Sequence, residues 1–161
     1  MDEIFDVTGD EQFKATHEIG HVLIAERFGI NWDYVTIESD DPQKGGHVHH
    51  NEDFILTEDN LSDFVMMKMA GEAILLAVGY NKLAALMSSS LSSDCDRENA
   101  KEMIAGVNWL IDVNRYIQDA LTENERYFSQ SEMRKKTDFL VAELVSRKTI
   151  NRQEFLELLR E

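Results

Sequence analysis

The sequence predicts one mostly helical domain with a small β element. Its 161 residues, 43% of them apolar and 29% charged, are about the size of a single domain. No repeat or linker-like composition divides the chain, so residues 1–161 are expected to share one core. Apolar residues recur at helical intervals over several long segments, whereas the segments typical of β-strands are short and few.

The first helix is expected over residues 10–28. Its apolar stripe has helical spacing. The stripe consists of Phe13, His17, His21, Ile24 and Phe28. Thr8 and Glu11 have the spacing of a capping box, and Gly29 is a typical terminator. These signals together place both ends of the helix.

Two short strands and a central helix are expected next. The strands cover residues 34–37 and 46–50, and Asp40, Pro42 and Gly45 favour a turn between them, which gives a hairpin or small sheet. Residues 60–79 are apolar on nearly every side, which is typical of a buried helix at the centre of a core.

The second half of the chain is expected to be helical after a loop. The loop is Ser88–Asp94, and a helix is expected to follow from Asp96 to about Asn114. The C-terminal third predicts one further helix and a short last one. Their apolar positions are Phe139, Leu140, Leu144 and Val145 in the first, and Phe155, Leu156 and Leu159 in the second.

Charge and composition exclude several classes of function. Sixteen Lys and Arg against 31 Asp and Glu give a net charge of −15, which repels the phosphates of nucleic acids and anionic lipids. The start of the chain lacks the basic residues of a secretory signal, and the longest apolar run, residues 73–80, is far shorter than the roughly 18 residues of a membrane span. We therefore expect a cytoplasmic protein that neither enters a membrane nor binds nucleic acid. Because Cys95 is the only cysteine, a metal site must rely on His, Asp and Glu.

The segment His17-Glu18-Ile19-Gly20-His21 matches the H-E-x-x-H pattern. On a helix, the i, i+4 spacing places both imidazoles on one face, where they can share a zinc ion at about 2.0–2.1 Å while Glu18 serves as general base. The pattern arises by chance in roughly one chain in a hundred of this composition. Both histidines lie on the apolar stripe, however, and burying two imidazoles is costly unless they are bonded or bind a metal. The pattern therefore favours a zinc site.

A third ligand must come from elsewhere, since catalytic zinc sites use three protein ligands. Helical phase distinguishes the candidates around residue 95. Asp96 shares its face with the apolar Ala100, Met103 and Val107, whereas Asp94 and Cys95 are in phase with polar residues. Asp96 is therefore the preferred ligand, although a carboxylate in the first turn of a helix can also serve only the helix dipole.

Other candidate ligands have simpler explanations. Glu72 follows Lys68 by four residues, so an ion pair on the helix surface explains it better than ligation, and it is kept in reserve. The strand histidines His47, His49 and His50 are also candidates. His47 and His49 share one side of their strand, where they are either ordinary edge residues or groups that hold a substrate or an oxyanion.

Several segments resemble the FtsH-type zinc peptidase domain in the same order. Residues 15–25, Ala-Thr-His-Glu-Ile-Gly-His-Val-Leu-Ile-Ala, are similar to its H-E-A-G-H segment, and residues 69–73 to its A-G-R-A helix. Residues 34–37 and 45–48 are similar to the strands after the zinc helix, and residues 96–100 to its D-x-E-x-A segment. The resemblance covers nearly the whole chain and implies the helical fold of that peptidase domain, with Asp96 as third zinc ligand.

The chain also departs from this family. No glycine is followed by lysine, so the chain lacks the P-loop of the family's ATPase. Leu75 and Leu76 stand where the family often has carboxylates, and Ile19 replaces an alanine inside the zinc motif. Because the chain lacks an ATPase that could unfold proteins, we expect its substrates to be peptides or unfolded protein segments.

The sequence therefore predicts a zinc-dependent endopeptidase. His17, His21 and Asp96 are expected to bind zinc and Glu18 to act as general base, while the strand with Gly46, His47 and Val48 pairs with an extended substrate. Two alternatives stay open. The chain could be a non-catalytic zinc-binding regulatory module, or a peptidase subunit that depends on a separate ATPase, and it could also form a homo-oligomer.

Overall fold

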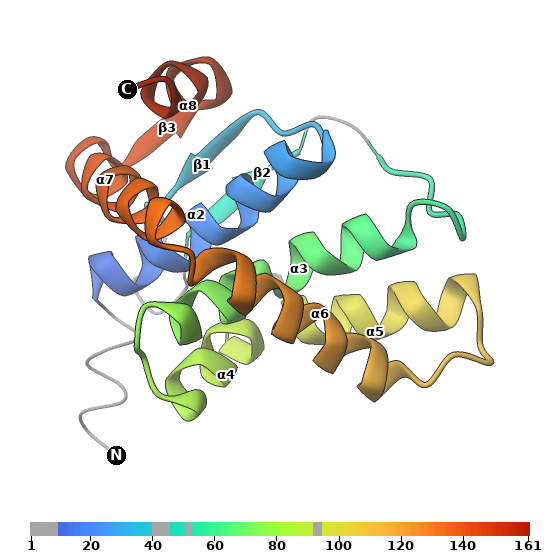
Figure 1. Cartoon of the computed structure of the whole chain (residues 1–161). Helices are drawn as coiled ribbons and strands as arrows, with labels where there is room; N and C mark the ends of the chain where they lie inside the picture. The colour runs from blue at the N-terminus through green and yellow to red at the C-terminus, as the bar shows by residue number, and fades with distance from the viewer. Residues whose placement is uncertain (1–9, 40–45, 51–52, 92–94) are drawn as a thin grey trace.

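The protein is mainly helical, with a small antiparallel sheet at one side (Figure 1). The computed structural model describes residues 10–39, 46–50, 53–91 and 95–161. The elements, labelled as in Figure 1, are α2 (Glu11–Phe28), β1 (Tyr34–Thr36), β2 (His47–His49), α3 (Leu61–Ala77), α4 (Lys82–Leu91), α5 (Asp96–Val107), α6 (Val113–Phe128), α7 (Ser131–Arg147), β3 (Thr149–Asn151) and α8 (Arg152–Leu159).

Helix α2 confirms the first expected helix almost to the residue. The Asp10 side chain caps it by accepting hydrogen bonds from the backbone N–H groups of Gln12 and Phe13, so the expectation that Thr8 caps this helix is wrong. Thr8 itself lies outside the described residues. The helix ends at Gly29, whose φ of 70° is the left-handed conformation that glycine adopts without strain.

Helix α3 confirms the expected central buried helix and packs closely against α2. It is buried over most of its length. A Cβ at Gly20 of α2 would collide with the carbonyl oxygen of Ala70 and the side chain of Ile74. The missing side chain lets the backbones of α2 and α3 approach each other closely.

The sheet has three strands in the order β2-β1-β3, all antiparallel. The hairpin strands predicted from the sequence are confirmed, with Val35 opposite Val48, while the predicted turn residues Asp40, Pro42 and Gly45 lie outside the described residues. Strand β3 was not predicted. Its Ile150 is fully buried opposite Val35, and this leaves β2 as an edge strand.

Two sequence predictions about the second half are wrong. Helix α4 continues through Leu91, so residues 88–91 are not a loop, and residues 92–94 lie outside the described chain. The helix expected to reach Asn114 ends at Val107. A new helix, α6, starts at Val113, because the Asp112 side chain accepts a hydrogen bond from the backbone N–H of Arg115 and so caps a separate helix.

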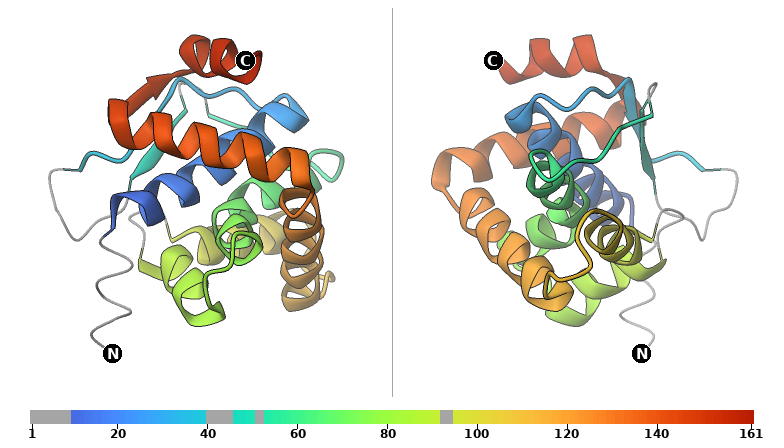
Figure 2. Two further views of the ribbon diagram at one scale, coloured as in Figure 1. Left: turned by 60° about the vertical axis from the view of Figure 1, so that its left-hand side comes forward. Right: turned by 90° about the vertical axis from the view of Figure 1, so that its right-hand side faces the viewer.

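Helix α7 covers the side of α2 that faces away from α5, and α8 packs against β3 (Figure 2). The apolar positions expected for them are mostly confirmed. Leu140 and Leu144 of α7 and Phe155 of α8 are fully buried, whereas Phe139 is 38% exposed. None of the described helices is long and apolar enough to cross a membrane. The packing leaves the histidine face of α2 against α3 and the start of α5.

Candidate metal centre

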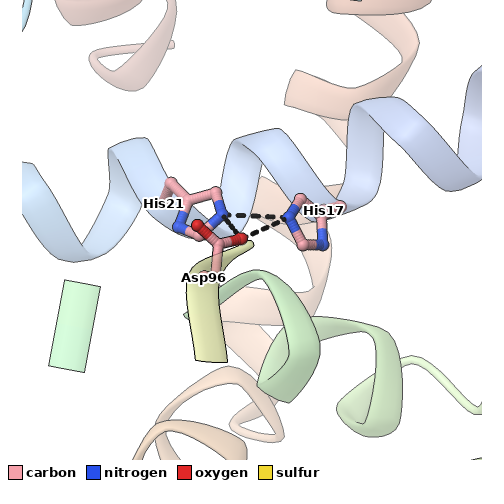
Figure 3. A group of neighbouring side chains, drawn as sticks. All are labelled: His17, His21 and Asp96. Carbon is pink, nitrogen blue, oxygen red and sulfur yellow. Dashed lines mark hydrogen bonds and ion pairs between the residues drawn. The ribbon is translucent and has the colours of Figure 1, made fainter. Parts of the chain in front are cut away.

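Three buried side chains from two helices converge on one point (Figure 3). His17 and His21 lie one turn apart on α2, with their Nε2 atoms 3.0 Å from each other. Asp96, the first residue of α5, brings its Oδ2 to 3.1 Å from each of these nitrogen atoms. Residues 79 positions apart in the sequence therefore present three ligand atoms to one point.

The spacing and burial of these atoms fit a metal ion. In a tetrahedral zinc site with bonds of 2.0–2.1 Å, neighbouring ligand atoms are about 3.3 Å apart, close to the separations found here. All three side chains are buried, with exposed fractions of 4% for His17, 8% for His21 and 3% for Asp96. The group could hold a metal ion.

The hydrogen-bond partners of the two imidazoles assign their tautomers. Nδ1 of His21 lies 2.7 Å from the carbonyl oxygen of Met67, which can only accept, so this nitrogen carries a proton. Nδ1 of His17 lies 3.0 Å from Oγ of Ser88, whose own proton goes to the carbonyl oxygen of Ala85 at 2.6 Å. Nδ1 of His17 is therefore also the donor. In the neutral imidazoles, both Nε2 atoms are left without a proton.

This arrangement calls for a positive charge at the point of convergence. Two unprotonated Nε2 atoms and a carboxylate oxygen lie within 3.1 Å of one another, and their lone pairs repel unless a cation stands between them. The cation is either an added proton or a metal ion. Two imidazoles and one carboxylate are ligands that zinc and related transition metals prefer.

Without a metal, the site holds a proton tightly. Burial disfavours the charged form of His21, but the charge of the Asp96 carboxylate, its hydrogen bond and the charge of Glu18 outweigh burial and raise the pKa of His21 to about 9. Burial likewise opposes charge on Asp96, and the two histidines overcome it and hold the pKa of Asp96 far below its usual range. Both shifts describe the same ion pair, and a metal ion would replace its proton.

Helix α3 provides the surface on which both histidines rest. The Met67 carbonyl oxygen fixes His21, and Gly71 lies directly under the imidazole of His17. A Cβ at Gly71 would collide with three atoms of that ring. A glycine inside an otherwise apolar helix is therefore explained by a close contact with a ligand.

Glu18 and the metal group share one small cavity. The cavity has a volume of about 120 Å³. Its lining residues are Glu18, His21, Val48, His50, Met67, Lys68 and Asp96. Glu18 is only 4% exposed and is not one of the three grouped ligands. The predicted general base therefore borders the same space as two of the predicted ligands.

Part of the predicted substrate strand lies beside this cavity. Val48 lines it, together with His50, two residues further along the chain. Gly46 packs against β1, where a Cβ would collide with the carbonyl oxygen of Thr36. The rings of His47 and His49 instead contact Tyr34, at centroid distances of 5.8 and 4.9 Å. A role for Gly46, His47 and Val48 in binding substrate stays a prediction.

The other candidate ligands lie outside the group of three. Glu72 is buried, so the expected surface position is wrong, and its Oε1 accepts a hydrogen bond from Arg97. Cys95 is exposed. Asp94 lies outside the described residues. The helical-phase argument for Asp96 is confirmed, because Asp96 and Ala100 are both buried on the same face of α5.

Sequence reasoning missed the partners that orient the ligands. Ser88 was assigned to a loop, and its partner His17 is 71 positions away in the sequence. The contact with Met67 uses its backbone carbonyl oxygen, which every residue has, so the residue type gave no signal. Gly71 gave the one available signal, as a glycine within an apolar helix.

No protein-family model matches the chain, and no curated protein matches it. The class that the fold and the centre define is a helical protein with a buried His-His-Asp group able to hold a metal.

Proposed function

We propose that the metal is zinc and that the protein is a zinc-dependent endopeptidase acting on peptides or unfolded protein segments. The observation that carries the proposal is the position of Glu18. It borders the same cavity as His21 and Asp96 without being a member of the ligand group. A carboxylate in that place suits proton transfer during hydrolysis rather than ligation.

Each residue then has a distinct task. His17, His21 and Asp96 would hold the ion, which matches the three protein ligands of catalytic zinc sites. A zinc ion in such a site acts as a Lewis acid on a scissile carbonyl and acidifies water. Glu18 accepts the proton of the attacking water and passes it to the leaving amine. Its burial, with 4% of its surface exposed, keeps bulk water from competing for that proton.

The edge strand β2 suits an extended substrate. β1 occupies one side of β2, so its other side is open to pairing within the described sheet. An extended peptide added there would run past Val48, which borders the cavity of Glu18. Backbone pairing places a peptide bond near the site without requiring a particular side chain, which agrees with unfolded segments as substrates.

The test compares wild-type protein with Glu18→Gln. Both are incubated with zinc and with casein and a peptide library, and cleavage products are identified by mass spectrometry. Glu18→Gln should bind zinc as wild type does and lose cleavage by a factor of about 10²–10⁴, because proton transfer is lost and the ligands remain. Cleavage by Glu18→Gln at the wild-type rate would overturn the mechanism.

A non-catalytic zinc-binding module is the second candidate. The deep burial of all three ligands favours it, because a closed site suits structural zinc. Zinc binding with no cleavage by wild type would support this candidate. Cleavage that appears only when an ATPase and ATP are added would instead assign the chain as the subunit of a larger peptidase.

A further inference from the structure

A second buried carboxylate lies beside the metal group and is bound to an arginine. Glu72 of α3 is 4% exposed, and its Oε1 lies 2.6 Å from Nη2 of Arg97 in α5. Arg97 is the residue directly after Asp96. Buried ion pairs add little net stability in general, so their presence next to a site calls for a specific reason.

The ion pair completes a set of contacts between one segment of α3 and the whole metal group. Met67 accepts the hydrogen bond of His21, and Gly71 makes room for the ring of His17. Glu72 comes next in the chain and binds the neighbour of Asp96. Residues 67–72 thus contact the two histidines directly and reach the aspartate through Arg97.

The start of α5 needs such an anchor. Cys95, which precedes Asp96, has a φ of 45°, a left-handed conformation that costs a non-glycine residue about 1–2 kcal/mol. The apolar anchors of α5, Ala100 and Ile104, lie one and two turns further on. Glu72 and Arg97 tie the first turn itself to α3.

We propose that Glu72 is a positioning residue for the metal site. Acting through Arg97, it holds the first turn of α5 so that Oδ2 of Asp96 meets the Nε2 atoms of His17 and His21. The inference rests on the proposed zinc site, but it is independent of peptidase activity.

The test measures zinc affinity by titration against a competing chelator, at a temperature where every variant is folded. Glu72→Gln keeps the size of the side chain and removes its charge, and it should weaken zinc binding about 10-fold, the effect typical of outer partners of metal ligands. Arg97→Met should weaken it similarly. The double variant should bind no more weakly than either single one, because both residues act through one contact.

Glu26→Gln is the matched control. Glu26 lies on α2, the helix of the histidines, and its Oε1 accepts a hydrogen bond from Nε of Arg152 at 2.7 Å, so the same substitution breaks a comparable ion pair away from the site. It should lower the melting temperature and leave zinc affinity unchanged. A purely structural role for Glu72 would give that same pattern.

The outcomes separate the two proposals. Weaker zinc binding by Glu72→Gln and Arg97→Met, with altered visible absorption of the bound Co²⁺ that replaces zinc, supports the inference. Wild-type zinc affinity in both variants overturns the positioning role of Glu72 but does not contradict the proposed zinc site. If wild type binds no metal, both proposals fall. If Glu72→Gln does not fold, Arg97→Met decides, since the side chain of Arg97 is 25% exposed and tolerates change better.

Discussion

Two cavities border α2 and differ in size and in chemistry. The larger, about 610 Å³, lies between the N-terminal half of α2, the chain after α3 and α7. Its charged residues, such as Arg134 and Asp138, are exposed, and its buried polar groups are the hydroxyls of Thr16 and Thr137. The smaller, about 120 Å³, is bordered by three buried ionisable groups, Glu18, His21 and Asp96.

Chemistry rather than volume distinguishes the candidate site from the larger cavity. Burying an ionisable group is costly unless a partner compensates it, so three such groups around one small space indicate a built site. The hydroxyl of Thr16 in the larger cavity is satisfied locally, by the carbonyl oxygen of Gln12.

The largest expected effect is the loss of metal binding in Asp96→Asn. Removing a ligand should weaken zinc binding by more than the roughly 10–100-fold effect of an outer partner. Asp94→Asn is the matched control, because the sequence prediction chose Asp96 rather than Asp94 as the third ligand. Zinc titration of both variants decides the assignment, and loss of binding in Asp94→Asn instead of Asp96→Asn would contradict it.

Metal-free protein should lose stability as the pH rises from 6.5 to 9. The pKa of His21 is raised from 6.5 to about 9, so its charged form stabilises the folded state fully below pH 6.5 and this contribution disappears as the pH passes 9. The expected loss is roughly 2–3 kcal/mol. Urea unfolding with a chelator present measures it. Asp96→Asn should flatten the profile, and an equally steep loss in that variant would exclude the His21–Asp96 pair as the cause.

Ser88→Ala should weaken zinc binding about 10-fold, because the proton on Nδ1 of His17 loses its acceptor and the ring loses its fixed orientation. Ser129→Ala provides the control, since the Ser129 hydroxyl donates to the Glu125 carbonyl oxygen at 2.6 Å on the exposed surface. Competition titration should show wild-type affinity for the control. Equal zinc affinities of Ser88→Ala and Ser129→Ala would show that Ser88 does not contribute to zinc binding.

The smallest effect is expected in the larger cavity. Oγ1 of Thr137 is buried without a hydrogen-bond partner among the described residues, so Thr137→Val should raise the free energy of unfolding by up to about 1 kcal/mol. Zinc affinity should not change. Thermal melting measures the change in stability, and a loss of stability in Thr137→Val would show that this hydroxyl has a partner in solution.

The sequence predicted what local periodicity controls. The spacing of His17 and His21 placed both on one helix face, and the phase of Asp96 selected it over its neighbours, as the structure confirms. The central helix α3 and the hairpin of β1 and β2 followed from equally local patterns.

Contacts between distant segments escaped prediction. Strand β3 has only three residues and forms because β1, more than 100 positions earlier, offers an open edge. Ser88 and the Met67 carbonyl acquire their roles only when α4 and α3 pack on α2. The burial of Glu72 likewise depends on Arg97, 25 positions away, rather than on helix spacing.

The metal content of the protein shows whether His17, His21 and Asp96 hold zinc. Protein purified without chelators, or stripped and reconstituted with zinc, is analysed by mass spectrometry under native conditions, alongside a His17→Ala/His21→Ala variant. Because three ligand atoms converge on one point, we expect one zinc ion per wild-type chain and none in the variant. Wild-type protein that carries no transition metal and takes none up on reconstitution, or a variant that still binds one zinc ion, would contradict it.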